Sequence, residues 1–376
     1  MNPRLLLAVA LPLVFVARGV PESRLSANQD GTTIVNAADG VQEPEVASTI
    51  AFTSTRDNYN ASWAVPPIVG GEIYFIDYMT DGSFSPPRRV TSNTYADIFP
   101  ALSPDGKGKV VFDSNRRRTS GEPVNTSDLF LMSHEGTDQQ FLIRGGSPTW
   151  APAGPTGEAS KTIAFHASGS GAGLPINRFP GAATDDSDIF TVNVDDLLEH
   201  GALPQNLTIN RVATVDDDPN WSPDGRKIIF TSYVNDPSST LTSAEIYIMN
   251  SDGTGQAQLT SDGIEKRGPA WSPDGRRILF ACRSGAPNAA GVATFEICVM
   301  DAVANGPVTQ LTLNNINEVT PTWSPDGQAI VFHRTPANQL WVMSADGSGQ
   351  TQLTVPPGFN LLATSWDVIA VGRGAR

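Results

Sequence analysis

The residues best suited to chemistry are two histidines at equivalent places in a repeated pattern. Of the four histidines, His166 follows Phe165 and His333 follows Phe332. Imidazole is a common ligand of transition metals, and a metal site of histidine and acid is the feature that a lyase would need. Both histidines fall on strands that we expect to lie away from the axis of the fold. We therefore predict no metal or other cofactor, and His166 and His333 are the only candidate ligands.

Charged residues gather just before the tryptophans of the same pattern. Asp97, the run 216–218 and Glu318 hold this place in three copies, and Lys266 and Arg267 hold it in a fourth. If these segments descend into a central channel, an acidic funnel would attract a cationic peptide segment or a metal ion. The alternative is that they are solvated loop acids, some of which cap neighbouring amides.

The pattern itself is a repeat of about 50 residues. Identical Trp-Ser-Pro-Asp-Gly pentapeptides begin at Trp221, Trp271 and Trp323, and weaker copies begin at Leu102 and Trp150. A period of this length is typical of solenoids and propellers. The acids in these pentapeptides lack the spacing of a calcium loop, so we interpret Pro-Asp-Gly as hairpin-turn chemistry.

Each copy continues in the same order. A strand ending in Phe follows the pentapeptide, as in 228–230, and a strand of the Glu-Ile-Tyr type comes next, as in 245–247. An Asp-Gly turn and a Leu-Thr pair close the unit, as in 252–255 and 259–260. With the strand around the Trp, each unit has four antiparallel strands, which is the make-up of a propeller blade.

Counting the copies predicts an all-β, six-bladed β-propeller over residues 46–371. The first copy lacks a pentapeptide before Ile50, whereas the C-terminus carries a spare strand pattern at 365–370. We therefore expect the N- and C-terminal strands to share one blade, which closes the ring and leaves no open sheet edge.

These motifs resemble the TolB-like propeller repeat, a relative of the WD-type repeat. The resemblance covers about residues 46–371 and implies an exported binding protein associated with the cell envelope. The segment before the first blade is too short for the α/β domain that precedes the propeller in TolB. The repeat also occurs in some peptidases and in pectate-degrading lyases. No Gly-x-Ser-x-Gly elbow is present in the sequence.

The N-terminus predicts export. Arg4 precedes an apolar stretch interrupted by Pro12, and a small-x-small site follows, so we interpret residues 1–19 as a signal peptide, with an uncleaved anchor as the alternative. Residues 20–45 form a polar tether and 372–376 a tail. Beyond residue 20 we find no apolar stretch long enough to span a membrane. We expect a periplasmic or secreted, monomeric protein.

The net charge excludes one class of partner, and the two cysteines bear on the redox state of the protein. The chain has 25 Lys and Arg against 39 Asp and Glu, a net charge of −14, which argues against nucleic acid. Cys282 and Cys298 would suit one disulfide in an exported protein, or two small buried thiols.

Long loops between the Phe-ending strand and the next strand mark the predicted binding face. They span 53–71, 113–127 and 166–187, opposite the Pro-Asp-Gly turns. Insertions on one face of a repeat array usually form its binding surface. The candidate residues on this face and the channel are Trp63, Arg116, Arg117, Arg118, Arg178, Asp97, Asp217 and Glu318.

The sequence thus predicts a non-catalytic propeller that recognises a protein or peptide in the cell envelope. The alternative is a metal-dependent polysaccharide lyase or another carbohydrate-active propeller enzyme.

Overall fold

The structure is a computed structural model. It describes residues 44–54, 71–104, 108–117, 127–153, 160–168, 187–209, 214–234, 244–284, 291, 293–334 and 339–353, together with the backbone of 361–367. Its contacts separate Met1–Pro44 from a compact unit, Glu45–Arg376, to which every element below belongs. The predicted signal segment and C-terminal tail lie outside the described residues, as does all of the tether but its last two residues.

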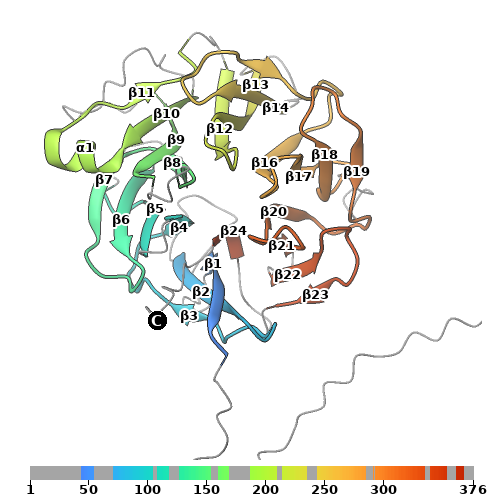
Figure 1. Cartoon of the computed structure of the whole chain (residues 1–376), viewed down its shortest axis with the longest axis horizontal. Helices are drawn as coiled ribbons and strands as arrows, with labels where there is room; N and C mark the ends of the chain where they lie inside the picture. The colour runs from blue at the N-terminus through green and yellow to red at the C-terminus, as the bar shows by residue number, and fades with distance from the viewer. Residues whose placement is uncertain are drawn as a thin grey trace, which may run out of the picture. The chain divides into compact units, whose positions relative to one another are not determined.

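The compact unit is an all-β propeller of antiparallel sheets arranged in a ring (Figure 1). Four of its sheets have four strands each. One of these sheets consists of β24 (Leu361–Asp367), β1 (Val46–Ser54), β2 (Glu72–Met79) and β3 (Arg88–Arg89). The next consists of β4 (Asp97–Leu102), β5 (Lys109–Ser114), β6 (Asp128–Ser133) and β7 (Gln140–Arg144). Another consists of β16 (Lys266–Trp271), β17 (Arg277–Cys282), β18 (Glu296–Asp301) and β19 (Val308–Gln310). The last consists of β20 (Glu318–Trp323), β21 (Ala329–Arg334), β22 (Gln339–Ser344) and β23 (Thr351–Gln352).

The remaining sheet has eight strands, which differs from the six separate four-stranded blades expected from the sequence. Its first group is β8 (Gly146–Trp150), β9 (Thr162–Ser168), β10 (Ser187–Asn193) and β11 (Gln205–Asn206). Its second group is β12 (Thr214–Trp221), β13 (Lys227–Val234), β14 (Glu245–Asn250) and β15 (Ala257–Gln258). A single parallel residue pair, Ser187 with Val215, joins β10 to β12. The two groups are joined because the start of β10 lies beside the start of β12 at this pair.

The predicted closure of the ring is confirmed. Strand β24 pairs antiparallel with β1, and Trp366 lies opposite Ile50 while Thr364 lies opposite Phe52. Figure 1 shows the C-terminal β24 beside the N-terminal β1 at the inner side of their sheet. The two ends of the propeller therefore hold each other through main-chain hydrogen bonds.

The core lies between neighbouring sheets and is built from the second and third strands. The Phe that ends each predicted second strand is fully buried, as Phe52, Phe165 and Phe230 show. Each of these rings lies opposite an aromatic ring of the third strand, such as Phe230 opposite Tyr247, with centroids 5.8 Å apart. Cross-strand aromatic pairs stabilise a sheet beyond the area that they bury.

The repeated Leu-Thr pair has a structural role. The Thr260 hydroxyl donates to a Glu245 carboxylate oxygen at 2.5 Å and accepts from the Ile246 amide at 3.0 Å. Thr91, Thr208 and Thr312 make the same two contacts in their sheets. The repeat thus conserves a bond between the fourth strand and a buried acid at the start of the third.

We expect the substitution Thr260→Val to lower the free energy of unfolding by about 2 kcal/mol, because it leaves a buried amide and a buried carboxylate each short of one partner. Urea unfolding followed by circular dichroism measures the change. Thr309→Val, at an exposed position on an outer strand, is the matched control. A loss no larger than that of the control would contradict the proposed role.

The Pro-Asp-Gly turns behave as predicted. The Ser222 hydroxyl donates to Asp224 at 2.6 Å, the Arg226 amide donates to the same oxygen at 3.1 Å, and Gly225 has a φ of 69°. The hydrogen bond from Ser222 lowers the pKa of the Asp224 carboxyl. Asp274 and Asp326 repeat the arrangement. These acids are therefore occupied within their own turns.

One helix, α1 (Val194–His200), replaces the hairpin turn between β10 and β11. Asn193 caps its N-terminus, since its side chain accepts from the amides of Asp195 and Asp196, and Gly201 ends it in the left-handed region. The repeat pattern does not predict this helix. In the described part of the chain, no helix has the length and apolar character needed to cross a bilayer.

Candidate binding channel

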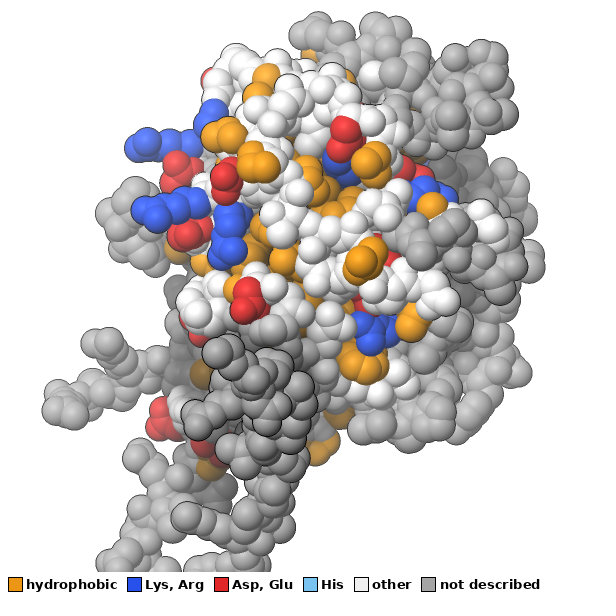
Figure 2. All heavy atoms as spheres, turned by 90° about the vertical axis from the view of Figure 1, so that its right-hand side faces the viewer, with side chains coloured by type: hydrophobic (Ala, Val, Ile, Leu, Met, Phe, Trp, Pro, Cys, Tyr) orange, Lys and Arg blue, Asp and Glu red, His pale blue; other side chains and the backbone are white. Residues whose placement is uncertain are grey.

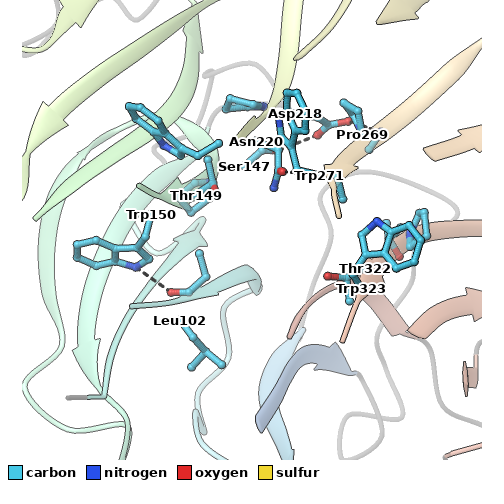
Figure 3. Close-up of a pocket in the computed structure, with 18 of the residues that line it drawn as sticks. Leu102, Ser147, Thr149, Trp150, Asp218, Asn220, Pro269, Trp271, Thr322 and Trp323 are labelled. Atoms are coloured by element: carbon cyan, nitrogen blue, oxygen red, sulfur yellow. Dashed lines mark hydrogen bonds between the residues drawn. The ribbon is translucent and has the colours of Figure 1, made fainter. Parts of the chain in front are cut away.

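A cavity of about 600 Å³ lies where the inner strands β4, β8, β12, β16 and β20 meet (Figure 3). It extends from the middle of these strands to the Pro-Asp-Gly turns. The inner strands β4, β8, β16 and β20 are edges of their sheets, whereas β12 pairs with β10 through a single residue pair.

Two tiers of prolines line this cavity. The first tier lies two residues before each Trp or its replacement, and the second lies in the turn that follows. The lining prolines are Pro100, Pro148, Pro219, Pro269 and Pro321 in the first tier and Pro104, Pro152, Pro223, Pro273 and Pro325 in the second. Proline has no amide hydrogen, so it prevents an edge strand from pairing with another chain at that point. The cavity wall is therefore apolar and poor in backbone donors.

The residue before each first-tier proline lies in the left-handed region. The φ angles of Phe99, Ser147, Asp218 and Thr320 lie between 48° and 52°, and that of Gly268 is 55°. Each of these residues lies within a β-bulge of its inner strand. Positive φ is unusual for residues other than glycine, and such strain concentrates at functional sites. The bulges turn the middle of each inner strand at the cavity wall. A proline two residues before the tryptophan is the sequence signal for these bulges, and the expectations above did not include it.

The tryptophans of the repeat contact neighbouring blades. The Trp150 indole donates from Nε1 to the carbonyl of Ala101 on β4 at 3.1 Å, and Trp323 packs with Leu279 and Ile297 of the preceding sheet. Leu102 takes the place of a tryptophan on β4. These side chains border the cavity and also join adjacent sheets (Figure 3).

Two acids of the predicted funnel are buried in ion pairs. Asp97 is 0% exposed. Its carboxylate accepts two hydrogen bonds at 2.9 Å from Arg116 and a third from Ser114. Glu318 is also 0% exposed and accepts from Arg334 Nε at 2.7 Å. Both carboxylates are thus paired with an arginine inside their sheets and are not presented to the channel, although Glu318 Oε2 has no hydrogen-bond partner among the described atoms.

The two described arginines of the predicted binding face also contact their own sheet. Arg116 lies over the Phe130 ring at 4.4 Å, and Arg117 lies over the Phe141 ring at 3.6 Å. These cation–π contacts hold the guanidinium groups against the sheet. Trp63, Arg118 and Arg178 lie outside the described residues.

Lys266 occupies the equivalent place on β16. It is 1% exposed, and its Nζ donates to Glu245 at 3.1 Å, to the Ile264 carbonyl at 2.7 Å and to Asp262. The start of an inner strand is therefore a recurrent place for a buried, paired charge of either sign, as Asp97, Lys266 and Glu318 show.

The acids 217 and 218 differ from Asp97 and Glu318. Asp217 is partly exposed, lies 3.3 Å from His166 Nδ1 and accepts from the Ser187 hydroxyl. Asp218 lines the cavity, where it accepts from the Ser147 hydroxyl at 3.2 Å and from the Gly268 amide at 3.3 Å. Burial and the charge of Asp217 raise the pKa of the Asp218 carboxyl. Arg267 is the other charged residue among those that line the cavity.

The two candidate histidines lie in different parts of the ring. His166 belongs to β9 and the buried His333 to β21, and Figure 1 shows these strands on opposite sides. Within the described ranges, no three His, Cys, Asp or Glu side chains gather so that they could hold a metal ion. The lyase alternative therefore gains no metal centre from this part of the chain.

The structure brings the two cysteines together. Cys282 on β17 and Cys298 on β18 have Cα atoms 6.0 Å apart, within the range that disulfides span. The sequence allows one disulfide or two buried thiols. This geometry favours the disulfide, and we expect it in the folded chain.

Comparisons with known proteins bear on the fold. No protein-family model matches the sequence, and no curated protein matches it. Among solved structures, TolB from Acinetobacter baumannii has a TM-score of 0.57 and 21% identity, and the match covers 85% of this chain and 66% of that one. The putative TolB from Agrobacterium tumefaciens has a TM-score of 0.53 and 18% identity, with 84% and 91% covered. The fold is that of the TolB-like propellers.

The TolB-like propeller fold also appears inside a larger protein. Hydrazine synthase from Kuenenia stuttgartiensis has a TM-score of 0.60 and 13% identity, and the match covers 87% of this chain and 47% of that one. This chain spans just under two thirds of the Acinetobacter baumannii TolB. At sequence identities of 21% and 18%, the similarity of this chain to the two TolB structures establishes a shared fold.

Proposed function

We propose that this protein is an exported, non-catalytic TolB-like propeller that binds a protein or peptide partner in the cell envelope, and that its central cavity receives part of that partner. The observation that carries the proposal is the cavity of about 600 Å³ with its two proline tiers and bordering tryptophans. Sites that bind ligands are concave and mostly apolar, with a few polar groups that set orientation. Asp218 and Arg267 supply the charged groups here.

We also infer that the ring has six blades of four strands. The eight-stranded sheet then counts as two blades, because a single parallel residue pair joins β10 to β12 in the described strands, whereas the strands within each group form antiparallel ladders. The sheet closed by β24 and β1 is the first blade.

Resemblance to TolB and the predicted signal segment support export to the envelope. The surface supports a protein partner rather than nucleic acid: Figure 2 shows basic and acidic side chains lying next to one another on the side that it presents. A protein with net charge −14 and no extended basic surface there lacks the electrostatic attraction that nucleic-acid binding needs.

The variant Thr322→Trp tests the cavity. Thr322 lines it between the proline tiers (Figure 3), so an indole at this position would fill part of the space. We expect affinity capture from an envelope extract to lose its main partner with Thr322→Trp and to retain it with Thr309→Trp, the matched change on the outer strand β19. Equal capture by both folded variants would place binding outside the cavity.

A second pair of variants separates the cavity from the long-loop face. Replacing residues 118–126 or 169–186 by short Gly-Ser linkers leaves strands β5, β6, β9 and β10 intact. Loss of capture in these variants, with capture retained by Thr322→Trp, would assign binding to the loops and overturn the cavity proposal.

A further inference from the structure

Ser147 on the inner strand β8 contacts a carboxyl group on each side, one on β5 and one on β12. The Ser147 amide on β8 donates to Asp113 Oδ2 on β5 at 3.3 Å, and the Ser147 hydroxyl donates to Asp218 Oδ1 on β12 at 3.2 Å. The other oxygen of Asp218 accepts from the Gly268 amide on β16 at 3.3 Å. This chain of contacts crosses from the sheet of β5 to that of β16, and it includes Ser147, Asp218 and Gly268, which lie in three of the bulges with positive φ.

The two carboxyls at this serine have no basic partner among the described ion pairs. Asp113 is 3% exposed, and its Oδ1 has no hydrogen-bond partner among the described atoms. The groups that face the pair are Ser127 beside β6, His166 on β9, Asp217 beside Asp218, and, farther away, Tyr233 on β13 and Arg267 on β16. Arg267 is held by Glu265. Two carboxylates that accept from the amide and the hydroxyl of the same serine lie close enough to repel each other when both are charged.

We infer that Asp113, Ser147 and Asp218 form a proton-dependent latch that joins β5, the second strand of its sheet, to the inner strands β8 and β12 at the wall of the cavity. The latch is closed while the carboxyl pair keeps a proton, since a neutral carboxyl both accepts from Ser147 and avoids the repulsion. When both carboxyls are ionised, the repulsion between the two carboxylates pushes β5 and β12 apart and strains their hydrogen bonds to Ser147. Because Asp218 lines the cavity, this change alters the shape of its wall.

The electrostatic evidence agrees with this geometry. Burial raises the pKa of the Asp113 carboxyl well above 3.8, and the nearby Asp218 charge acts in the same direction. Burial likewise raises the pKa of the Asp218 carboxyl. An acid with a raised pKa in the folded state adds stability that is fully present below its unfolded pKa, and this stability is lost as pH rises through the folded pKa.

The test compares the whole chain with two variants over a pH series above 4. The variants Asp113→Asn and Asp218→Asn each remove one ionisable group and keep a side chain that accepts hydrogen bonds. We expect the wild type to lose stability relative to each variant as pH rises, so that at neutral pH the variants show a folded-to-unfolded ratio about tenfold higher or more than the wild type. Asp301→Asn, at an exposed position on β18, is the control and should follow the wild type.

Hydrogen exchange gives an independent readout in the unmodified protein. After correction for the intrinsic pH dependence of exchange, the Ser147 and Gly268 amides should lose protection as pH rises, and the loss should be smaller in Asp113→Asn. Wild type and both variants with parallel pH profiles of stability would overturn the latch, as would Ser147 and Gly268 amides whose corrected protection does not change with pH. Neither measurement requires the ligand of the cavity, so failure of the latch leaves the proposed binding function to its own test.

Discussion

Replacing Lys266 with methionine should lower the free energy of unfolding by about 3–5 kcal/mol, the largest effect that we expect from a single substitution in this protein. Lys266 is the buried cation at the start of β16, and it neutralises Glu245, which is itself buried. Methionine keeps the volume of the side chain but leaves the Glu245 carboxylate without a cation, although Thr260 and the Gly263 amide still donate to it. An uncompensated buried charge carries a cost of this size. Chemical denaturation at neutral pH measures it.

A double variant identifies the cause of the Lys266→Met effect. If the loss comes from the orphaned carboxylate, Lys266→Met combined with Glu245→Gln should recover a large part of it, since no unpaired charge remains. A double variant as unstable as Lys266→Met alone would show that packing around the lysine stem, and not the charge pair, determines stability here.

Removing both cysteines should lower the free energy of unfolding by about 3 kcal/mol. The disulfide that we expect between Cys282 and Cys298 spans 16 residues of sequence, and closing a loop of this length reduces the entropy of the unfolded chain by about this amount. The measurement compares urea unfolding of the oxidised wild type with that of Cys282→Ala/Cys298→Ala.

Reduction provides the control for the disulfide. A reductant should shift the wild type towards the double variant and leave the double variant unchanged. Two titratable thiols in the unfolded, non-reduced wild type would contradict the disulfide and favour the alternative of two buried cysteines.

Much of the fold follows from local sequence because the repeat encodes turns and strand pairing directly. Pro-Asp-Gly and Asp-Gly-Thr-Gly specify hairpins through fixed φ angles and side-chain hydrogen bonds, as Asp224 and Gly225 show. The spare strand at the C-terminus predicted the pairing of β24 with β1. The helix α1 was not predicted because it occurs between the third and fourth strands of one repeat copy. The pattern that the other copies share contains no such helix.

The candidate site was harder to predict because sequence position does not determine burial. Asp97, Asp217 and Glu318 have similar places before the repeated Trp or its replacement, yet two are buried in ion pairs with arginines on or just after the neighbouring strand and one is partly exposed beside a histidine. The pairing of Asp97 with Arg116 joins β4 to the turn that follows β5, which periodicity along one strand does not reveal.

The sequence alone determined that the chain makes repeated four-stranded antiparallel units and that its two ends share one sheet, because turn chemistry and strand alternation act over a few residues and recur in each copy. The tertiary structure decided which charges are buried in pairs, where the proline tiers enclose a cavity, and that Ser147 lies between two carboxyls from neighbouring blades. These features depend on strands that are far apart in the chain and become neighbours only when the ring closes.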